Sequence, residues 1–104
     1  MYRGTTPTLT INVTGETFTG CTVYVTLQQE NHMITKVNPT ITVDGDDSVI
    51  EVEYTQEETL SFRRGQGLLQ IRWIDSSETA YASPIKKVDI DAILKEGVIG
   101  YAGS

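Results

Sequence analysis

The chain has 104 residues, of which 38% are hydrophobic and 21% charged, and eight basic against fourteen acidic residues give a formal net charge of -6. This length and composition predict one globular domain over residues 1–104 and exclude a disordered chain. A surface of this charge should repel nucleic-acid phosphates and anionic membranes, so we expect neither as a partner.

One cysteine, Cys21, excludes an intramolecular disulfide within these residues, whereas small secreted domains usually carry several cysteines. The first residues lack the apolar segment of a signal peptide. No apolar run approaches the ~20 residues that cross a membrane. We therefore expect a soluble protein that is made in the cytoplasm.

Apolar and polar residues that alternate at a period of two predict about seven β-strands. The clearest is 67–73, where Leu69, Ile71 and Trp73 share one face. The other predicted strands are 8–13, 21–28, 32–37, 41–43, 48–54 and 79–88. Pro84 has no N–H to donate, so the last strand should lie at an edge or carry a bulge.

Two local patterns predict how the strands are connected. Asp44-Gly45 lies between two alternating segments and predicts a hairpin, because glycine adopts positive φ without cost. Thr55 followed by Glu58 has the spacing of a capping box and predicts one helical turn at 55–58.

The two ends of the chain have a different character. Residues 1–7 are predicted to form an extended arm, because Pro7 fixes its own φ and disfavours helix at Thr6. Residues 89–104 are predicted to form a short helix and a tail, with Asp89 as the cap and Gly97 after the last turn. The apolar stripe of this helix is Ile90, Ile93 and Leu94, and the tail carries Val98, Ile99 and Tyr101.

Short strands at regular spacing predict an all-β fold. The architecture that fits them is an immunoglobulin-like antiparallel β-sandwich of about seven strands with a short C-terminal helix. The two cysteines that flank a tryptophan in true immunoglobulin domains are absent from the sequence. The pattern therefore predicts the architecture and not that family.

No group of residues predicts catalysis. His32 lies near a hairpin turn without the converging partners of a general base. Cys21 is predicted on the inward face of a strand, where a buried thiol is inert. Asp44, Asp46 and Asp47 lack the spacing of a calcium-binding loop, so we expect a solvated turn.

The remaining acidic and aromatic residues have simple structural interpretations. Trp73 is predicted to pack in the core rather than to stack on a sugar, because it shares a face with Leu69 and Ile71. Glycoside hydrolysis would need a cleft with paired carboxylates. We instead expect a solvated sheet face and a helix cap at Glu51, Glu53, Glu57 and Glu58. The sequence thus predicts no enzyme, no cofactor and no metal site.

Contacts with partner proteins are the more informative prediction. The Arg63-Arg64 pair could hold a partner carboxylate, or it could be a polar loop. The arm and the tail could cover a neighbour in an assembly, or they could be frayed ends. The residues predicted to contact partners are Tyr2, Arg3, Pro7, Arg63, Arg64, Val98, Ile99 and Tyr101.

Four segments resemble small proteins encoded by phages and prophages of Gram-positive gut bacteria. They are YRGTTPT at 2–8, YTQEETL at 54–60, QIR at 70–72 and ILKEGVI at 93–99. The resemblance extends over the whole chain, and none of these motifs is catalytic. The chain is also similar in size and strand pattern to the immunoglobulin-like N-terminal domain of upper baseplate proteins. The resemblance implies a virion structural protein.

We therefore expect a non-enzymatic virion protein that acts through contacts with other virion proteins, in the tail, the baseplate or the head–tail region. Self-association into a homo-oligomer stays open. The alternatives are a capsid decoration protein and a monomeric module that binds a glycan or receptor through exposed tyrosines such as Tyr24 and Tyr81. The expected location is the virion, after synthesis in the host cytoplasm.

Overall fold

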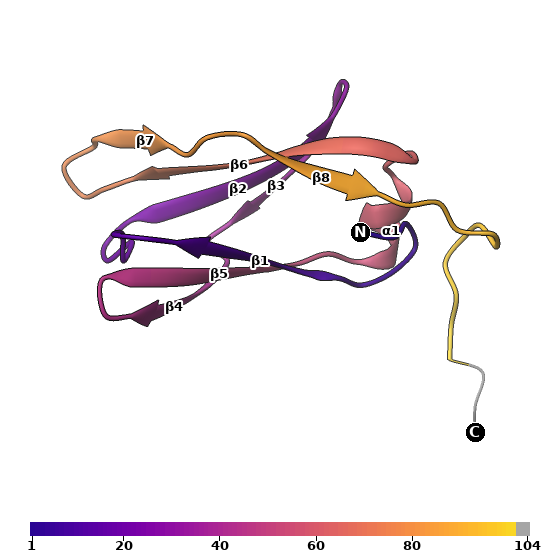
Figure 1. Cartoon of the computed structure of the whole chain (residues 1–104), viewed down its shortest axis with the longest axis horizontal. Coiled ribbons are helices and arrows are strands. Elements are labelled where there is room, and N and C mark those ends of the chain that lie inside the picture. The colour runs from indigo at the N-terminus through magenta and orange to yellow at the C-terminus, as the bar shows by residue number, and fades with distance from the viewer. Residues whose placement is uncertain (102–104) are drawn as a thin grey trace.

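The computed structural model describes residues 1–101 and consists mainly of β-strands, which confirms the predicted all-β class (Figure 1). The strands are β1 (Thr8–Val13), β2 (Thr22–Gln29), β3 (His32–Val37), β4 (Thr40–Asp44), β5 (Asp47–Glu53), β6 (Gly65–Ile74), β7 (Ala80–Ala82) and β8 (Lys86–Ile90). One helix, α1 (Gln56–Leu60), connects β5 to β6.

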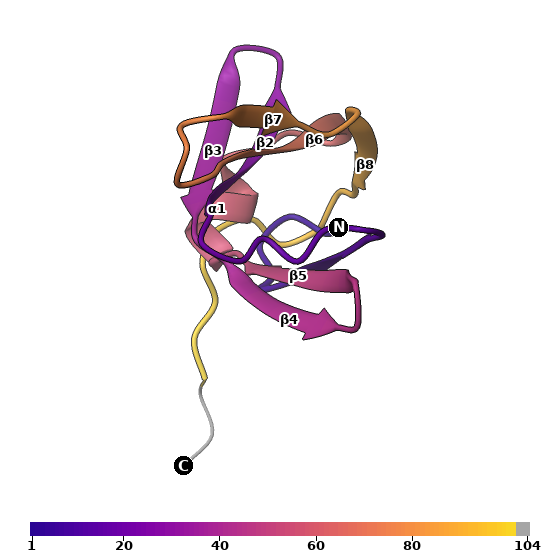
Figure 2. The ribbon, with the colours of Figure 1, turned by 90° about the vertical axis from the view of Figure 1, so that its left-hand side faces the viewer.

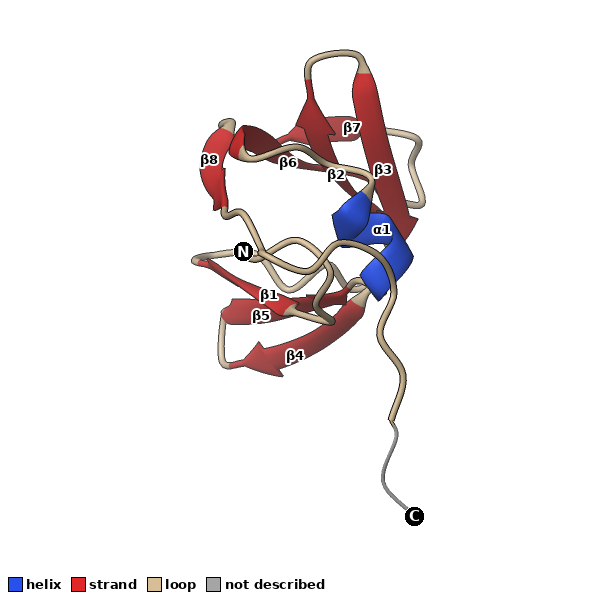
Figure 3. Ribbon diagram, turned by 90° about the vertical axis from the view of Figure 1, so that its right-hand side faces the viewer, coloured by secondary structure: helices blue, strands red, loops and turns tan. Residues whose placement is uncertain are grey.

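The strands form two antiparallel sheets that face each other (Figure 2). The smaller sheet has the order β1-β5-β4, and the larger has β3-β2-β6, with β7 and β8 each paired to a different part of β6. At ten residues β6 is the longest strand, and it contains the strand predicted over 67–73. Figure 3 shows β1 and β8 on one side of the sandwich and α1 on the other.

The core lies between the sheets and follows from the alternation of residues. The buried side chains include Val23, Val25 and Leu27 of β2, Ile50 and Val52 of β5, and Leu69 and Ile71 of β6. These are the inward faces that the period-two pattern predicts. Cys21 is an exception, since it precedes β2 and is only half-buried.

The two local turn predictions are confirmed. Asp44 pairs with Asp47, which leaves Gly45 and Asp46 as the two-residue turn of the β4–β5 hairpin, with Gly45 at a φ of 64°. At α1 the hydroxyl of Thr55 accepts the Glu58 amide at 3.2 Å, and the Glu58 carboxylate accepts the Thr55 amide at 2.9 Å. Each residue thus satisfies a backbone donor that a helix start leaves unpaired.

The single strand predicted over 79–88 is instead two short strands. β7 and β8 pair with opposite ends of β6, and Pro84 lies in the segment between them. Ser83 holds this segment to β6, because its amide donates to the Ile71 carbonyl at 2.8 Å and its hydroxyl accepts the Ile71 amide at 3.0 Å. The proline therefore lies at the sheet edge, in a break of the strand.

The helix predicted after Asp89 is wrong. Asp89 and Ile90 belong to β8, and Ile90 is buried against the core at 2% exposure. Asp91 then forms a parallel bridge with Tyr2, in which its amide donates to the Met1 carbonyl and its carbonyl accepts the Arg3 amide. These backbone groups are no longer available to a helix, whose first turn is costly to form. The end of the predicted tail, residues 102–104, lies outside the described residues.

The prediction of an extended N-terminal arm is also wrong, because backbone hydrogen bonds hold this segment against residues 89–91. The amino group of Met1 donates to the Asp89 carbonyl at 2.7 Å, and residues 1–3 run beside residues 89–91. Gly4 then turns the chain with a φ of +69°. The segment at 1–7 is therefore part of the folded body, because it covers the end of β8 and contacts Thr59 and Leu60 at the end of α1.

Gly4 provides the first prediction. A Cβ at this position would lie 2.8 Å from Cδ1 of Ile93, whereas a Cβ at Gly15, whose φ is +78°, would meet nothing within 4 Å. Gly15→Ala should therefore lower the free energy of unfolding by about 1 kcal/mol through backbone strain. Gly4→Ala adds a contact that the end of the Ile93 side chain must move to relieve, so it should cost roughly 0.5–1 kcal/mol more than Gly15→Ala. Urea denaturation of both variants measures the difference, and equal losses would contradict the packing of Ile93 on Gly4.

Candidate interaction surface

The outward side of β2, β3 and β6 in the larger sheet is nearly free of charge, whereas β8 at the sheet edge adds Lys87 and Asp89 on the same side. Strand register places the outward side chains in rows, opposite to the buried positions of β2 and β6. We call the outward side chains of β2, β3 and β6 the neutral face: Thr22, Tyr24, Thr26, Gln28, Met33, Thr35, Val37, Gln66, Leu68, Gln70, Arg72 and Ile74. Among these residues Arg72 carries the one charge.

Large apolar side chains are exposed on the neutral face. Met33 and Val37 are each 54% exposed, Leu68 41% and Tyr24 39%. Tyr24, Met33 and Arg72 line a shallow hollow of about 420 Å³. A surface that combines apolar side chains, threonine hydroxyls and one guanidinium suits the burial of a second protein surface.

The outward side of the smaller sheet is different. Its central strand β5 presents Glu51 and Glu53, which pair with threonines of β1 and β4. The hairpin at its end adds Asp44, Asp46 and Asp47. The two outer surfaces of the sandwich therefore differ in charge, and the neutral face is the one whose burial costs less desolvation.

The predicted tyrosine pair does not form a common binding surface. Tyr24 is opposite Arg72 in the sheet, whereas Tyr81 is opposite Trp73, the next residue along β6. Adjacent residues of a strand point to opposite faces. Tyr24 therefore belongs to the neutral face, and Tyr81 stacks on Trp73 with ring centroids 5.5 Å apart on the other side.

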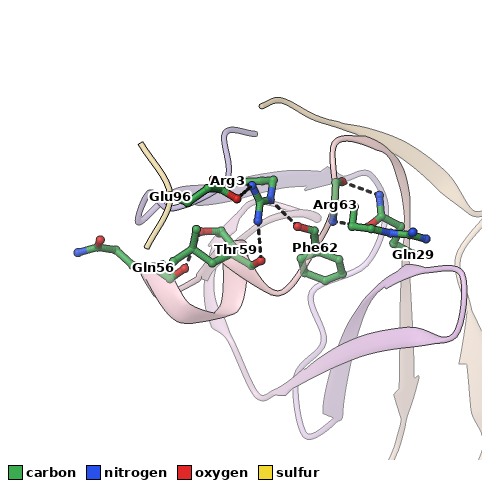
Figure 4. A network of polar contacts seen from close by, with 8 residues as sticks. Arg3, Gln29, Gln56, Thr59, Phe62, Arg63 and Glu96 are labelled. Carbon is green, nitrogen blue, oxygen red and sulfur yellow. Dashed lines mark hydrogen bonds and ion pairs between the residues drawn. The ribbon is translucent and has the colours of Figure 1, made fainter. Parts of the chain in front are cut away.

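Arg3 is at the centre of a network that connects both ends of the chain to α1 (Figure 4). Its guanidinium donates to the Phe62 carbonyl at 2.6 Å and to the Leu60 carbonyl at 3.0 Å. It also holds both oxygens of the Glu96 carboxylate, at 2.6 and 2.9 Å. The carbonyls at a helix end lack partners within the helix, so Arg3 caps α1. Only 17% of its side chain is exposed, which leaves little of it for a partner.

The other predicted contact residues of the two ends are only partly available. The Pro7 carbonyl accepts the Tyr54 amide at 3.1 Å, and Ile99 is held to α1 by two hydrogen bonds of 2.9 Å with the Gln56 amide group. Exposure remains high for Tyr2 (59%), Val98 (55%), Ile99 (56%) and Tyr101 (94%). The last residues described extend away from the sheets in Figure 1.

The two predicted loop arginines precede β6 and are not among the side chains of the neutral face. Gln29 fixes Arg63 through both backbone groups, because its amide donates to the Arg63 carbonyl and accepts the Arg63 N–H, each at 2.7 Å (Figure 4). The Arg63 guanidinium forms an exposed ion pair with Glu30. Arg64 is exposed in the same loop.

His32 and Cys21 have structural surroundings. The His32 ring packs on Phe62 with centroids 4.8 Å apart, and its Nε2 lies 2.7 Å from the Ser61 hydroxyl. Partial burial, followed by the carboxylates of Glu16 and Asp75, raises the pKa of the Cys21 thiol. A raised pKa disfavours the thiolate, which is the reactive form of cysteine.

The described residues contain no group of three or more histidine, cysteine, aspartate or glutamate side chains that could hold a metal ion. In the hairpin, Asp47 accepts the Gly15 amide at 2.9 Å. Within residues 1–101 no helix has the length and apolar character needed to cross a membrane.

The most perturbed ionisable groups lie between α1 and β3. Lys36 contacts both oxygens of the Glu58 carboxylate and lies over the Tyr54 ring, 5.3 Å from its centroid. Burial opposes the ionisation of Glu58, but hydrogen bonds from Lys36 and Thr55 outweigh it and lower the pKa of this carboxyl. Burial, with Glu58 as the second cause, raises the pKa of Tyr54 to about 12.

Tyr54 should make the fold sensitive to alkali. In an unfolded chain a tyrosine loses its proton near pH ~10, whereas folded Tyr54 keeps it to about 12. The unfolded state therefore binds fewer protons between these values, and the free energy of unfolding falls as the pH rises from 10 to 12. Tyr54→Phe should reduce this fall in urea titrations at pH 8 and 11, whereas the exposed Tyr101→Phe should not. An equal fall of the free energy of unfolding in both variants would contradict the assignment of the alkaline sensitivity to Tyr54.

Tyr54→Phe should also be tolerated at pH 8. Among the described residues, its buried hydroxyl and the indole N–H of Trp73 have no hydrogen-bond partner. Removal of an unsatisfied hydroxyl is close to neutral or slightly stabilising.

Comparisons with known proteins give no relatives. No family model, curated protein or solved structure matches the chain.

The neutral face does not follow from the pattern of any single strand, because that pattern identifies the inward residues and not which strands lie side by side. The signal that could have found it is the scarcity of charge at the alternate positions of 22–28, 33–37 and 66–74.

Proposed function

We propose that this chain is a non-enzymatic structural protein of a phage particle, which acts through contacts with other virion proteins. The neutral face is the observation that carries the proposal. A chain with a net charge of -6 leaves the outward side of three adjacent strands, β3, β2 and β6, with a single charge and four exposed apolar side chains. Such a patch on a soluble domain marks an interaction site.

The partner surface that fits is apolar with a carboxylate at its centre. Arg72 is flanked in the sheet by Tyr24 on β2 and Ala82 on β7, so an approaching acidic group would meet it among apolar atoms. Arginine pairs bidentately with carboxylates. We place this contact in the tail, the baseplate or the head–tail region, in agreement with the resemblance of the sequence to phage proteins.

We further propose an immunoglobulin-like topology for the sandwich. The sheet orders β1-β5-β4 and β3-β2-β6-β8 correspond to strands B-E-D and C′-C-F-G of that architecture, with α1 at the E–F connection. No strand of residues 1–101 pairs with β1 in the place of the first strand, A, and residues 1–3 instead bridge residue 91 after β8. An exposed sheet face with apolar side chains offers a broad contact surface, which suits a connecting role in a particle.

Mass spectrometry of purified particles tests the proposed function. Particles from the host that carries this sequence should contain the chain at a constant ratio to the major capsid protein across preparations. A chain that is abundant in the lysate and absent from washed particles would contradict a structural role in the virion.

A further inference from the structure

Strand β1 is an unprotected sheet edge. Its sequence, Thr-Leu-Thr-Ile-Asn-Val, contains none of the fourteen acidic and eight basic residues of the chain. Within residues 1–101 it pairs with β5 on one side and with no strand on the other. Edge strands are normally protected by charge, proline or a bulge, because their free backbone groups invite another strand.

An apolar groove runs beside this free edge. It has a volume of about 420 Å³ and reaches the core, because Leu69 and Ile71 of β6 form part of its wall. On the far side, the break between β7 and β8 leaves Ile85 60% exposed. The groove lies where an immunoglobulin-like sandwich carries its first strand, so a strand added at β1 would complete the sandwich.

The sequence of β1 is complementary to itself. An antiparallel pair of two copies with Ile11 opposite Ile11 places Leu9 opposite Val13 and Thr10 opposite Asn12. The side chains of Leu9, Ile11 and Val13 are half-buried on the core side, and those of Thr10 and Asn12 are exposed. Apolar residues therefore lie opposite apolar residues on the core side, and polar residues lie opposite polar residues on the exposed side, as strand register requires. A two-fold axis of this kind gives a closed dimer, the commonest oligomer.

Charge favours β1 over the opposite edge of the same sheet. Two copies that each carry -6 approach with least repulsion where neither presents a charge. β4 itself ends in a charged residue, Asp44, whereas β1 has none, and Glu51 of β5 lies opposite a threonine of both strands. We infer that a second copy of this chain pairs with β1 and joins two small sheets into one of six strands. This inference rests on the proposed assembly role and names one partner for it.

Exposed positions of β1 allow a test that spares the core. In the inferred register, Thr10→Lys with Asn12→Lys places lysines directly opposite each other twice, whereas Thr10→Lys with Asn12→Glu places opposite charges together. Like charges across a strand pair are destabilising and opposite charges stabilising. The matched control is Thr40→Lys with Thr42→Lys on β4, which are also exposed.

Analytical ultracentrifugation of the full chain measures the outcome. We expect the unmodified chain to show twice the mass of its 11.5 kDa monomer. The double-lysine variant should raise the dimer dissociation constant at least tenfold, and the lysine–glutamate variant should lower it. Circular dichroism should show unchanged folding in all three variants. A monomer at every concentration up to about 1 mM would overturn the inference, and so would a dimer that dissociates in the β4 control variant and not in the β1 double-lysine variant. The composition of the particles tests the assembly role independently of either result.

Discussion

Arg3→Ala should lower the free energy of unfolding by about 2–3 kcal/mol, although the residue lies near the start of the chain. The substitution leaves the carbonyls of Leu60 and Phe62 without their donor and releases Glu96. Hydrogen bonds from a charged group to half-buried acceptors are worth more than the exposed ion pair, which contributes at most ~1 kcal/mol. Thermal and urea denaturation measure the loss.

Arg64→Ala is the matched control for this change, because it removes the same side chain from an exposed loop. It should leave the unfolding free energy within about 0.5 kcal/mol of the unmodified chain. Hydrogen exchange adds a local test: Arg3→Ala should speed exchange in α1 and around Glu96 together, since the Arg3 side chain connects them. An Arg3→Ala variant as stable as the Arg64→Ala variant would contradict the capping role.

Arg72→Glu should remove the chain from phage particles. The substitution reverses the one charge of the neutral face, at a position where we propose a partner carboxylate. Like-charge repulsion in a buried contact costs several kcal/mol, which corresponds to a loss of affinity of about 100-fold or more. The amount of chain in particles, measured against the major capsid protein, reports the effect.

Arg64→Glu makes the same change of net charge outside the neutral face and also tests the loop contact predicted from the sequence. We expect it to assemble normally. Both variants should unfold at the temperature of the unmodified chain, because both arginines are exposed. If Arg64→Glu were excluded from particles and Arg72→Glu were retained, the contact would lie at the loop.

Local patterns in the sequence were sufficient where neighbours in the chain decide the structure. β1 and β3 begin and end at the predicted residues, and the capping box of Thr55 and Glu58 forms as expected. In each case the determining contacts lie within a few residues or follow the period of two.

Both ends were mispredicted because distant residues decide them. Arg3 reaches Leu60, Phe62 and Glu96, which lie 57 to 93 positions away in the chain. The spacing of Ile90, Ile93 and Leu94 fits a helix, yet β8 takes Ile90 into the core and Leu94 is fully exposed. The neutral face likewise requires the order of β3, β2 and β6, which single-strand patterns do not contain.

A photo-crosslinking amino acid at two valines in the assembled particle tests the central claim most directly. Val37 on the neutral face and Val43 on β4 are 54% and 50% exposed, so they report on different surfaces with similar access. We predict a crosslink from position 37 to another particle protein and none from position 43. A crosslink from position 43 alone, or from neither position in particles that contain the chain, would contradict the assignment of the neutral face as the assembly surface.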